Sequence, residues 1–103
     1  MINVIVTMVI KEGKLNEFIA ECAKVRPLVL EEKGCIAYDY MTEMPTAMTR
    51  QEPVNAHRVT LIERWESLED IDVHSQAKHM VEFVAKVKDL RESVVIRVGK
   101  PAF

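Results

Sequence analysis

The stretch that decides the fold is LIERWESLEDIDVHSQAKHM, residues 61–80. It begins as an apolar strand that ends at the only tryptophan, Trp65, and it then reaches Ser67, a residue type that caps helices. Two short helical stretches follow, and they carry two of the three histidines, His74 and His79. Aromatic and titratable side chains are concentrated here, so if the protein acts on a small aromatic molecule, we expect it to do so here.

The segments on either side switch between the periods of strands and helices. Residues 2–10 alternate with period two and are rich in β-branched side chains, which predicts a strand. Residues 14–32 place apolar side chains every three or four positions, which predicts a helix. Pro27 inside this helix predicts a kink near Val25, or else two shorter helices that meet there. Further strands are expected at residues 35–44, 57–65 and 92–100.

Two helices are expected between the last two strands. Ser67 and Asp70 form a motif similar to a capping box, which predicts the start of the first helix. Ser75 is expected to cap the second helix. The apolar stripe of that second helix consists of Met80, Phe83, Val84, Val87 and Leu90.

The order strand, helix, strand, strand, helix, strand predicts a single α+β domain over residues 1–103. Its topology is ferredoxin-like, with a four-stranded antiparallel sheet and helices on one face. The other face is left bare, and we expect it to carry large residues such as Tyr38 or Trp65. A second copy that covers such a face contributes about 25 cal/mol per Å² of apolar area. We therefore expect a homodimer whose two sheets enclose a water-poor chamber beside Trp65 and the histidines.

Composition excludes several classes of function. The chain is 49% hydrophobic and 29% charged, and its net charge of −2 has no basic stripe for nucleic acid. The N-terminal apolar run is too short to span a bilayer and has no basic region before it, so we expect a cytoplasmic protein that does not use a membrane. Cys22 and Cys35 lack a paired spacing, so we interpret them as small buried hydrophobes in a reducing compartment.

Residues 45–56 contain two prolines and no periodicity, which predicts one long loop. Long loops in compact domains often cover a functional opening. A surface excursion with no function explains the same residues equally well.

Three features resemble the antibiotic biosynthesis monooxygenase family, and more closely its quinol monooxygenase branch. The first is the opening strand with its glycine turn. The second is EEKGCIAY, residues 31–38, which looks like the family's E-x-G-C-x-x-Y entry to the second strand. The third and most specific is ERWES, residues 63–67, followed by His74 and by His79-Met80, which looks like the family's E-x-W-x-S…H…H-M pattern. The resemblance covers essentially the whole chain and implies a dimeric α/β barrel.

Proteins similar to this oxidise electron-rich phenols or quinols with molecular oxygen and use no metal, flavin or haem. A deprotonated quinol is itself a good one-electron donor. The protein therefore needs only to bind it in a dry pocket, to create the oxyanion and to admit oxygen. The resemblance thus implies a small aromatic substrate, O2 and no cofactor. Histidine suits the role of general base because its proton leaves between pH 5 and 8.

On this resemblance, His74 or His79 takes the substrate proton, and Glu63 orients a histidine or a water. The residues expected to line the ring pocket are Tyr38, Tyr40, Trp65, Met80 and Phe83. Structural interpretations stay open beside these roles. Trp65 is equally well explained as a core residue, His79 as a contact to the other subunit, and Glu63 with Arg64 as a surface ion pair.

Metal binding is not expected, because His74 and His79 are five residues apart, whereas ligands on one helix align at a spacing of four. His57 is interpreted as structural.

Two departures from the patterns of other branches of the family favour the quinol branch. Leu61 stands where some polyketide-pathway relatives have asparagine, and Asn3 lies too near the terminus to match the asparagine of haem-degrading relatives. Two other functions stay open, an acid/base isomerase of a small carbonyl compound and a non-catalytic dimer that binds a small ligand.

Overall fold

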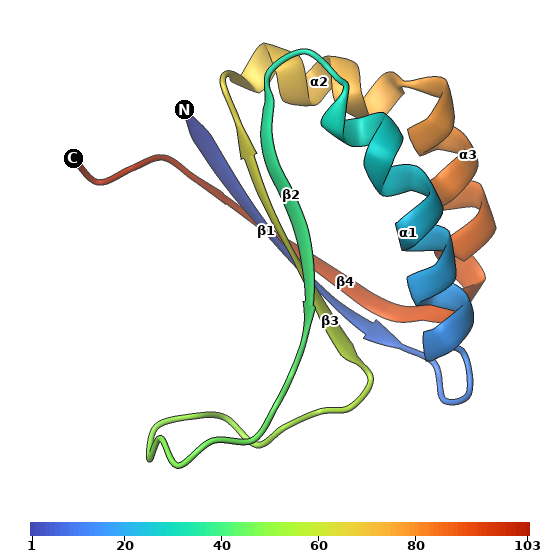
Figure 1. The fold of residues 1–103 in the computed structure, drawn as a ribbon, viewed down its shortest axis with the longest axis vertical. Helices are drawn as coiled ribbons and strands as arrows, with labels where there is room; N and C mark the ends of the chain where they lie inside the picture. Colours follow the sequence, from blue (N-terminus) through green and yellow to red (C-terminus); the bar gives the residue numbers. More distant parts are fainter.

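Strands and helices follow one another along the chain in the predicted order (Figure 1). The computed structural model describes residues 1–103, and the four strands and the first helix begin and end within two residues of the predicted bounds. The elements are β1 (Ile2–Ile10), α1 (Leu15–Leu30), β2 (Cys35–Thr42), β3 (Arg58–Trp65), α2 (Leu68–Gln76), α3 (Lys78–Val87), the 3₁₀ turn η1 (Lys88–Leu90) and β4 (Arg91–Gly99).

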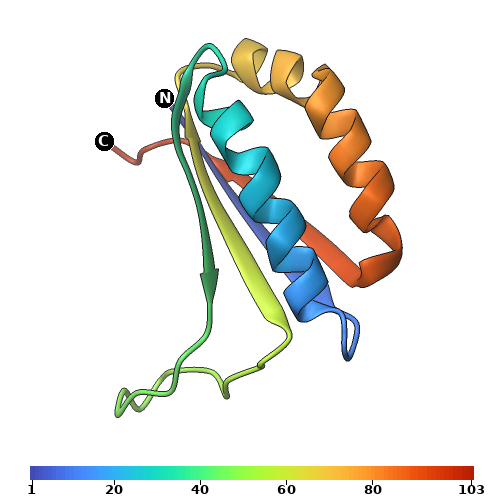
Figure 2. The ribbon, with the colours of Figure 1, turned by 45° about the vertical axis from the view of Figure 1, so that its right-hand side comes forward.

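The four strands form one antiparallel sheet in the order β2-β3-β1-β4. This is the ferredoxin-like arrangement that the sequence predicts, and the sheet stays open rather than closing on itself. The helices α1 and α3 lie on one side of the sheet, and α2 crosses its end (Figures 1 and 2). The other side of the sheet carries no helix. No helix of the structure has the length and the hydropathy needed to cross a bilayer.

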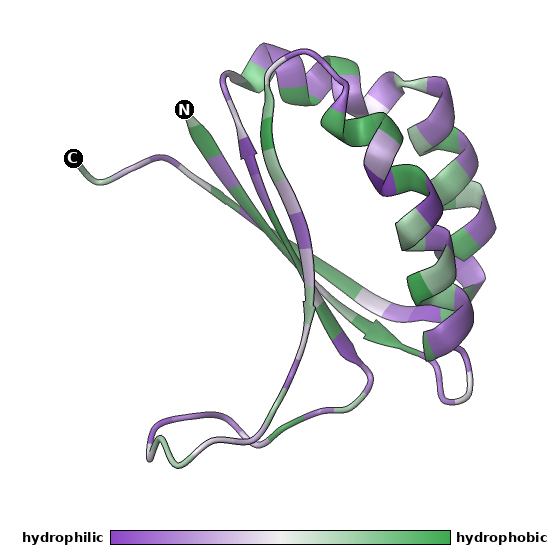
Figure 3. Ribbon diagram, viewed as in Figure 1, coloured by the Kyte–Doolittle hydropathy of each residue, from purple (hydrophilic) through white to green (hydrophobic).

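The core forms where the sheet meets the helices. Alternate residues of β1 are buried, and α1 buries one stripe of its surface, so both elements follow the periods expected for their type. Figure 3 shows hydrophobic residues along β1 and a mixture of hydrophobic and hydrophilic positions along α1 and α3. Pro27 lies inside α1, which continues past it as one helix rather than as two.

The prediction that Tyr38 and Trp65 occupy the bare face of the sheet is wrong. Only 2% of Tyr38 and 0% of Trp65 is exposed, because both side chains point into the core beneath the helices. Both faces of β3 carry apolar residues, such as Leu61 and Ile62, so alternation alone did not determine which face was buried. In β2 an irregularity between Cys35 and Ala37 sets which residues share the face of Trp65.

The two helix starts after β3 differ from each other. Ser67 caps α2 as predicted, since its Oγ accepts a hydrogen bond from the backbone N of Asp70 at 3.1 Å. The prediction that Ser75 caps α3 is wrong. Ser75 lies inside α2 and donates to the carbonyl of Asp72, and α3 begins after Ala77 without a side-chain cap.

The loop between β2 and β3 extends away from the helices, at the end of the sheet opposite α2 (Figures 1 and 2). Its base is tied by an ion pair between Arg58 Nε and Glu43 Oε2 at 3.3 Å. The backbone N of Asn55 also donates to Glu43 at 2.9 Å. Most residues between these two anchors are exposed, so in this chain the loop is a surface excursion.

Candidate active site

A cavity of about 280 Å³ lies between the helices and the sheet. Thirteen of its seventeen lining residues are hydrophobic. Four of the residues expected to line the pocket do so, Tyr38, Tyr40, Met80 and Phe83, and two of the expected catalytic residues, Glu63 and His74, line it as well. The chamber was expected between two bare sheets, but this cavity lies within one chain and on the helix side. No residue of the β2–β3 loop lines it.

His74 projects from α2 into the aromatic end of this cavity. The cap at Ser67 fixes the start of α2, and the helix then places His74 against the end of β3. The imidazole centroid lies 4.6 Å from the indole of Trp65 and 5.6 Å from the ring of Tyr38. Only 7% of the His74 side chain is exposed. Its ring orientation is therefore fixed by packing on two sides.

Glu32, which follows α1, holds both histidines. Its carboxylate lies 2.9 Å from Nδ1 of His74 and 2.7 Å from Nε2 of His79. An ionised carboxylate only accepts hydrogen bonds, so Nδ1 of His74 carries the proton that is donated to Glu32. When the imidazole is neutral, its Nε2 is therefore a hydrogen-bond acceptor, and no protein group donates to it. A carboxylate that orients an imidazole in this way leaves it ready to act as a base.

The two histidines converge because the helix breaks between them. In a continuous α-helix, residues five apart point about 140° away from each other. Ala77 has φ −62° and ψ 140°, an extended conformation that ends α2 and redirects the chain into α3. This single residue brings His74 and His79 to the same carboxylate.

Glu63 and Trp65 form a second buried pair on β3. Trp65 Nε1 donates to Glu63 Oε1 at 2.9 Å, and only 6% of Glu63 is exposed. Burial raises the pKa of Glu63; the hydrogen bond from Trp65 and the charge of His74 oppose this, and the charge of Glu32 adds to it. The interpretation of Glu63 and Arg64 as an ion pair is wrong, because Arg64 points to the other face and donates to Asn3 at 2.9 Å.

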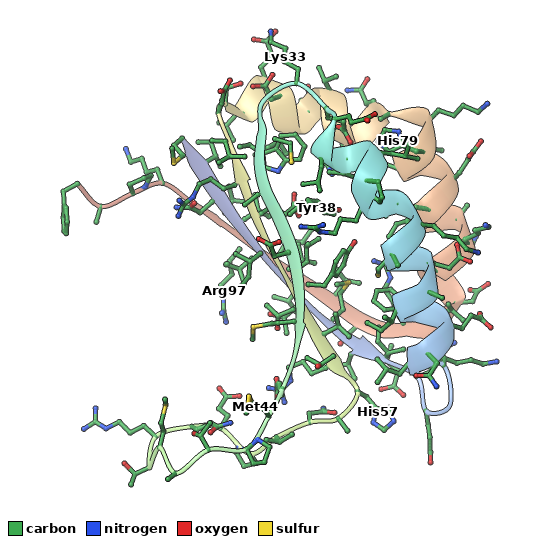
Figure 4. The ribbon with its side chains drawn as sticks, viewed as in Figure 1. Lys33, Tyr38, Met44, His57, His79 and Arg97 are labelled. Carbon is green, nitrogen blue, oxygen red and sulfur yellow. The ribbon has the colours of Figure 1, made fainter.

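Two residues expected in the site lie outside the cavity wall. Trp65 lies behind His74 and does not line the cavity, although it fixes both His74 and Glu63. His79 lies in a separate groove between α1 and α3 and reaches the site only through Glu32. Figure 4 shows Tyr38 between the sheet and the helices, with His57 at the end of the molecule opposite His79. No three His, Cys, Asp or Glu side chains converge in a way that would hold a metal ion.

Glu32 is the residue whose role the sequence analysis missed. It belongs to the EEKGCIAY motif, which was recognised only as the entry to β2. Its partners lie more than forty positions further along the chain, so no local pattern pairs them. The motif was the available signal, because an acidic residue just before a turn glycine is not needed for the turn itself.

The chain is similar to known proteins over most of its length. The model of the family described as antibiotic biosynthesis monooxygenase matches residues 1–86. The Escherichia coli K12 protein named "Probable quinol monooxygenase YgiN" is 30% identical over 91 residues, which cover 88% of this chain and 83% of that protein.

Solved structures share the fold. A conserved protein from Methanosarcina mazei Go1 superposes with a TM-score of 0.83 at 23% identity, over 96% of this chain and 90% of that one. A protein from Nitrosomonas europaea superposes with a TM-score of 0.86 at 17% identity, over 100% of both chains. Since the family model covers most of the chain, the protein belongs to the antibiotic biosynthesis monooxygenase family.

Proposed function

We propose that this protein is a monooxygenase that oxidises a small aromatic quinol or phenol with O2, with His74 as the general base. The observation that carries the proposal is the hydrogen bonding and the position of His74. Its Nδ1 is held by Glu32, and its Nε2 is left as an acceptor on the wall of an apolar cavity. A relative of similar length is named as a probable quinol monooxygenase, and this supports the substrate class.

The first step is binding and deprotonation. The apolar walls take up the ring system, and Tyr38 and Phe83 provide aromatic surface. His74 Nε2 accepts the proton of the ring hydroxyl. Glu32 stabilises the imidazolium that forms, because its carboxylate is already hydrogen-bonded to Nδ1. The product of this step is a bound quinolate, which is a far better electron donor than the quinol.

The second step consumes oxygen. The electron-rich ring carbon of the quinolate forms a C–O bond to O2 and gives a ring peroxide, which takes a proton from the His74 imidazolium. The C–H bond at that carbon and the O–O bond then break, and water leaves with a carbonyl formed on the ring. One quinol and one O2 yield one hydroxyquinone and one water, so the substrate supplies all the electrons. The protein positions the reactants and excludes solvent.

Glu63 is proposed to assist as an acid at the same wall. Burial raises the pKa of Glu63, which favours a protonated carboxyl that donates a hydrogen bond to developing negative charge. Trp65 fixes the orientation of this carboxyl through its indole N–H. The acid and the base of the proposed reaction thus line one cavity.

The test is oxygen uptake with a panel of naphthoquinols, measured with an oxygen electrode on protein treated with a chelator. We expect consumption above the rate of spontaneous quinol oxidation. Under ¹⁸O2, mass spectrometry should find one labelled oxygen in the quinone product and one in water. His74→Ala should lower the rate by about 10²- to 10⁴-fold, the usual contribution of a general base. His57→Ala is the matched control, because His57 lies at the other end of the molecule.

Each alternative gives a different result. Uptake of O2 with hydrogen peroxide and no labelled quinone would indicate an oxidase rather than a monooxygenase. No uptake, together with exchange of α-protons of a small ketone, would support an acid/base isomerase that uses His74 and Glu63. Tight binding of a quinone with neither activity would support a ligand-binding protein.

A further inference from the structure

The far end of the cavity carries a cation without a counter-charge. Arg91 is the first residue of β4, and its side chain lines the cavity. Its Nε is buried without a hydrogen-bond partner, and no carboxylate lies within ion-pair distance of the guanidinium. The guanidinium donates one weak hydrogen bond within the protein, from Nη1 to the sulfur of Met8 at 3.9 Å. Arg91 as a whole is half-buried. A charge that loses part of its hydration is normally paired in proteins, because nothing else compensates for the loss.

A hydroxyl without a partner lines the same cavity. Tyr40 Oη is buried, and although Tyr38 and Cys22 are its polar neighbours, no hydrogen bond of normal geometry joins it to either. Burial raises the pKa of Tyr40, so its hydroxyl keeps the proton and is a donor. Burial also raises the pKa of Cys22 to about 11, so this thiol is neutral and does not balance the charge of Arg91.

The register of the sheet separates these groups from Glu63, the proposed acid, and so from His74, which packs against the Trp65 that holds Glu63. Glu63 pairs with Val4 of β1. Tyr40 lies opposite Leu61, which is two residues before Glu63 on β3. The Arg91 guanidinium lies further still, at Met8. Met8 lies four positions after Val4 on β1, about 13 Å along the strand. The cavity thus has a polar group at each end and apolar walls between them.

We propose that Arg91 and Tyr40 form an oxyanion-binding subsite, and that the substrate is an aromatic hydroxy compound with a carboxylate remote from its reacting hydroxyl. The planar guanidinium suits two oxygens of a carboxylate, and Tyr40 supplies a further donor. This inference rests on the proposed function to identify the hydroxyl that reacts. The subsite itself is defined by binding alone. The apolar span between the ends favours fused rings over a single small ring.

The experiment is calorimetric titration with two matched naphthols, 6-hydroxy-2-naphthoate and 2-naphthol. The first carries a carboxylate on the ring remote from the hydroxyl, and the second lacks it. We expect the wild-type protein to bind the carboxylate about 10- to 100-fold more tightly, the contribution of charge-assisted hydrogen bonds. Arg91→Gln should reduce this preference to about twofold or less. Tyr40→Phe should reduce it partly, and Arg91→Lys should retain part of it.

Arg97→Gln is the matched control, because Arg97 lies on the same strand but on the side of the sheet away from the helices (Figure 4). It should leave the preference unchanged. Equal binding of the two naphthols by the wild-type protein would overturn the subsite, as would no binding of 6-hydroxy-2-naphthoate. A preference that survives in Arg91→Gln would overturn it as well. If Arg91→Gln fails to fold, Tyr40→Phe carries the decision, since it removes one oxygen atom.

The readouts separate this inference from the proposed function. His74→Ala should keep the preference for the carboxylate although it loses oxygen uptake. A wild-type protein that shows the preference but consumes no oxygen would refute the monooxygenase and retain the subsite. A third outcome would refute the subsite alone. In it, the wild-type protein shows no binding preference for the carboxylate, and Arg91→Gln leaves the rate of oxygen uptake with neutral naphthoquinols unchanged.

Discussion

Glu32 orients the proposed base, although it does not line the cavity itself. Replacing Glu32 by Gln removes the charge and puts a donor where one acceptor oxygen stood. The Nδ1–H tautomer of His74 is then no longer enforced. We expect kcat for the quinol to fall on the order of 10²-fold or more. Long-range ¹H–¹⁵N NMR should show one His74 tautomer in the wild-type protein and a mixture in the variant.

His79→Ala is the control for this prediction. It removes the second contact to Glu32 but leaves the contact between Glu32 and His74. The His74 tautomer should therefore stay as in the wild-type protein, and the loss of activity should be smaller. An unchanged tautomer in Glu32→Gln would contradict the expectation that the charge of Glu32 is needed to hold it.

Glu63 makes stability depend on pH. Its pKa in the folded state is raised by burial, so the folded protein binds a proton more tightly than the unfolded chain does. The contribution of Glu63 to stability is therefore greatest below the unfolded pKa of this carboxyl, near 4.5. It falls as pH rises from there through the folded pKa, by about 1.4 kcal/mol for each unit of difference between the two.

Glu63→Gln should remove this dependence and keep an acceptor for the Trp65 indole. Urea unfolding at several pH values should then show the variant gaining on the wild-type protein as pH rises from 4 towards neutrality. A constant difference between the two proteins over that range would contradict the expectation. The variant should also lose oxygen-uptake activity if the carboxyl acts as the acid.

Residue types in this site were predictable from the sequence, but their contacts were not. Tyr38, His74 and Glu63 were selected from their motif, and all three line one cavity. The carboxylate that joins the histidines was missed, because the contact depends on the extended backbone of Ala77. An alanine in a sequence does not indicate that a helix breaks there. Long-range packing therefore determines which residue orients the base.

At the scale of elements, one glycine couples the end of α1 to the start of α2. Gly34 has φ +81°, and a Cβ built on it would overlap the carboxylate of Asp70, which belongs to the cap with Ser67. Gly34→Ala adds the strain of a left-handed backbone and displaces that cap. We expect a loss of about 3 kcal/mol in the free energy of unfolding. The melting temperature should fall by more than about 10 °C.

Gly13→Ala is the matched control, because Gly13 has φ +79° and open space around its Cα. It carries the backbone strain without the overlap, so its loss should be about 1–2 kcal/mol. The difference between the two variants measures the contact with Asp70. Equal losses would show that this contact is relieved by a small shift of the side chain.

The elements were predicted better than the details of their ends. Period two and period 3.6 placed the four strands and α1 to within two residues, because one face of each of these elements is buried. The last helix was expected to include Leu90, but α3 ends at Val87 and Leu90 lies in the 3₁₀ turn. Ser67 was predicted as a cap from the spacing Ser-x-x-Asp after a strand, and its extended backbone in the structure fits that role. Ser75 has the same chemistry, but the chain around it is still helical, and the tertiary position of α3 decides where α2 ends.

At the scale of the molecule, the sheet face without helices is the expected dimer interface. It carries exposed apolar side chains at Met41, Ile62 and Val95, and a second copy would bury them. We expect light scattering coupled to size-exclusion chromatography to give twice the 11.8 kDa chain mass. Ile62→Glu should shift the protein towards monomer. Val73→Glu, on the exposed surface of α2, should not, and a wild-type monomer at all concentrations would refute the dimer.

The place of the β2–β3 loop has a consequence for engineering. Asn3 pairs with Gly99, so both termini lie at one end of the sheet, while the loop leaves from the other end (Figure 1). A circular permutant that joins the termini with a short linker and opens the chain near Met48 would keep every strand pairing and every cavity wall intact. The same exposed site would accept a fluorophore or an affinity tag far from His74, so that binding is reported without altering the chemistry.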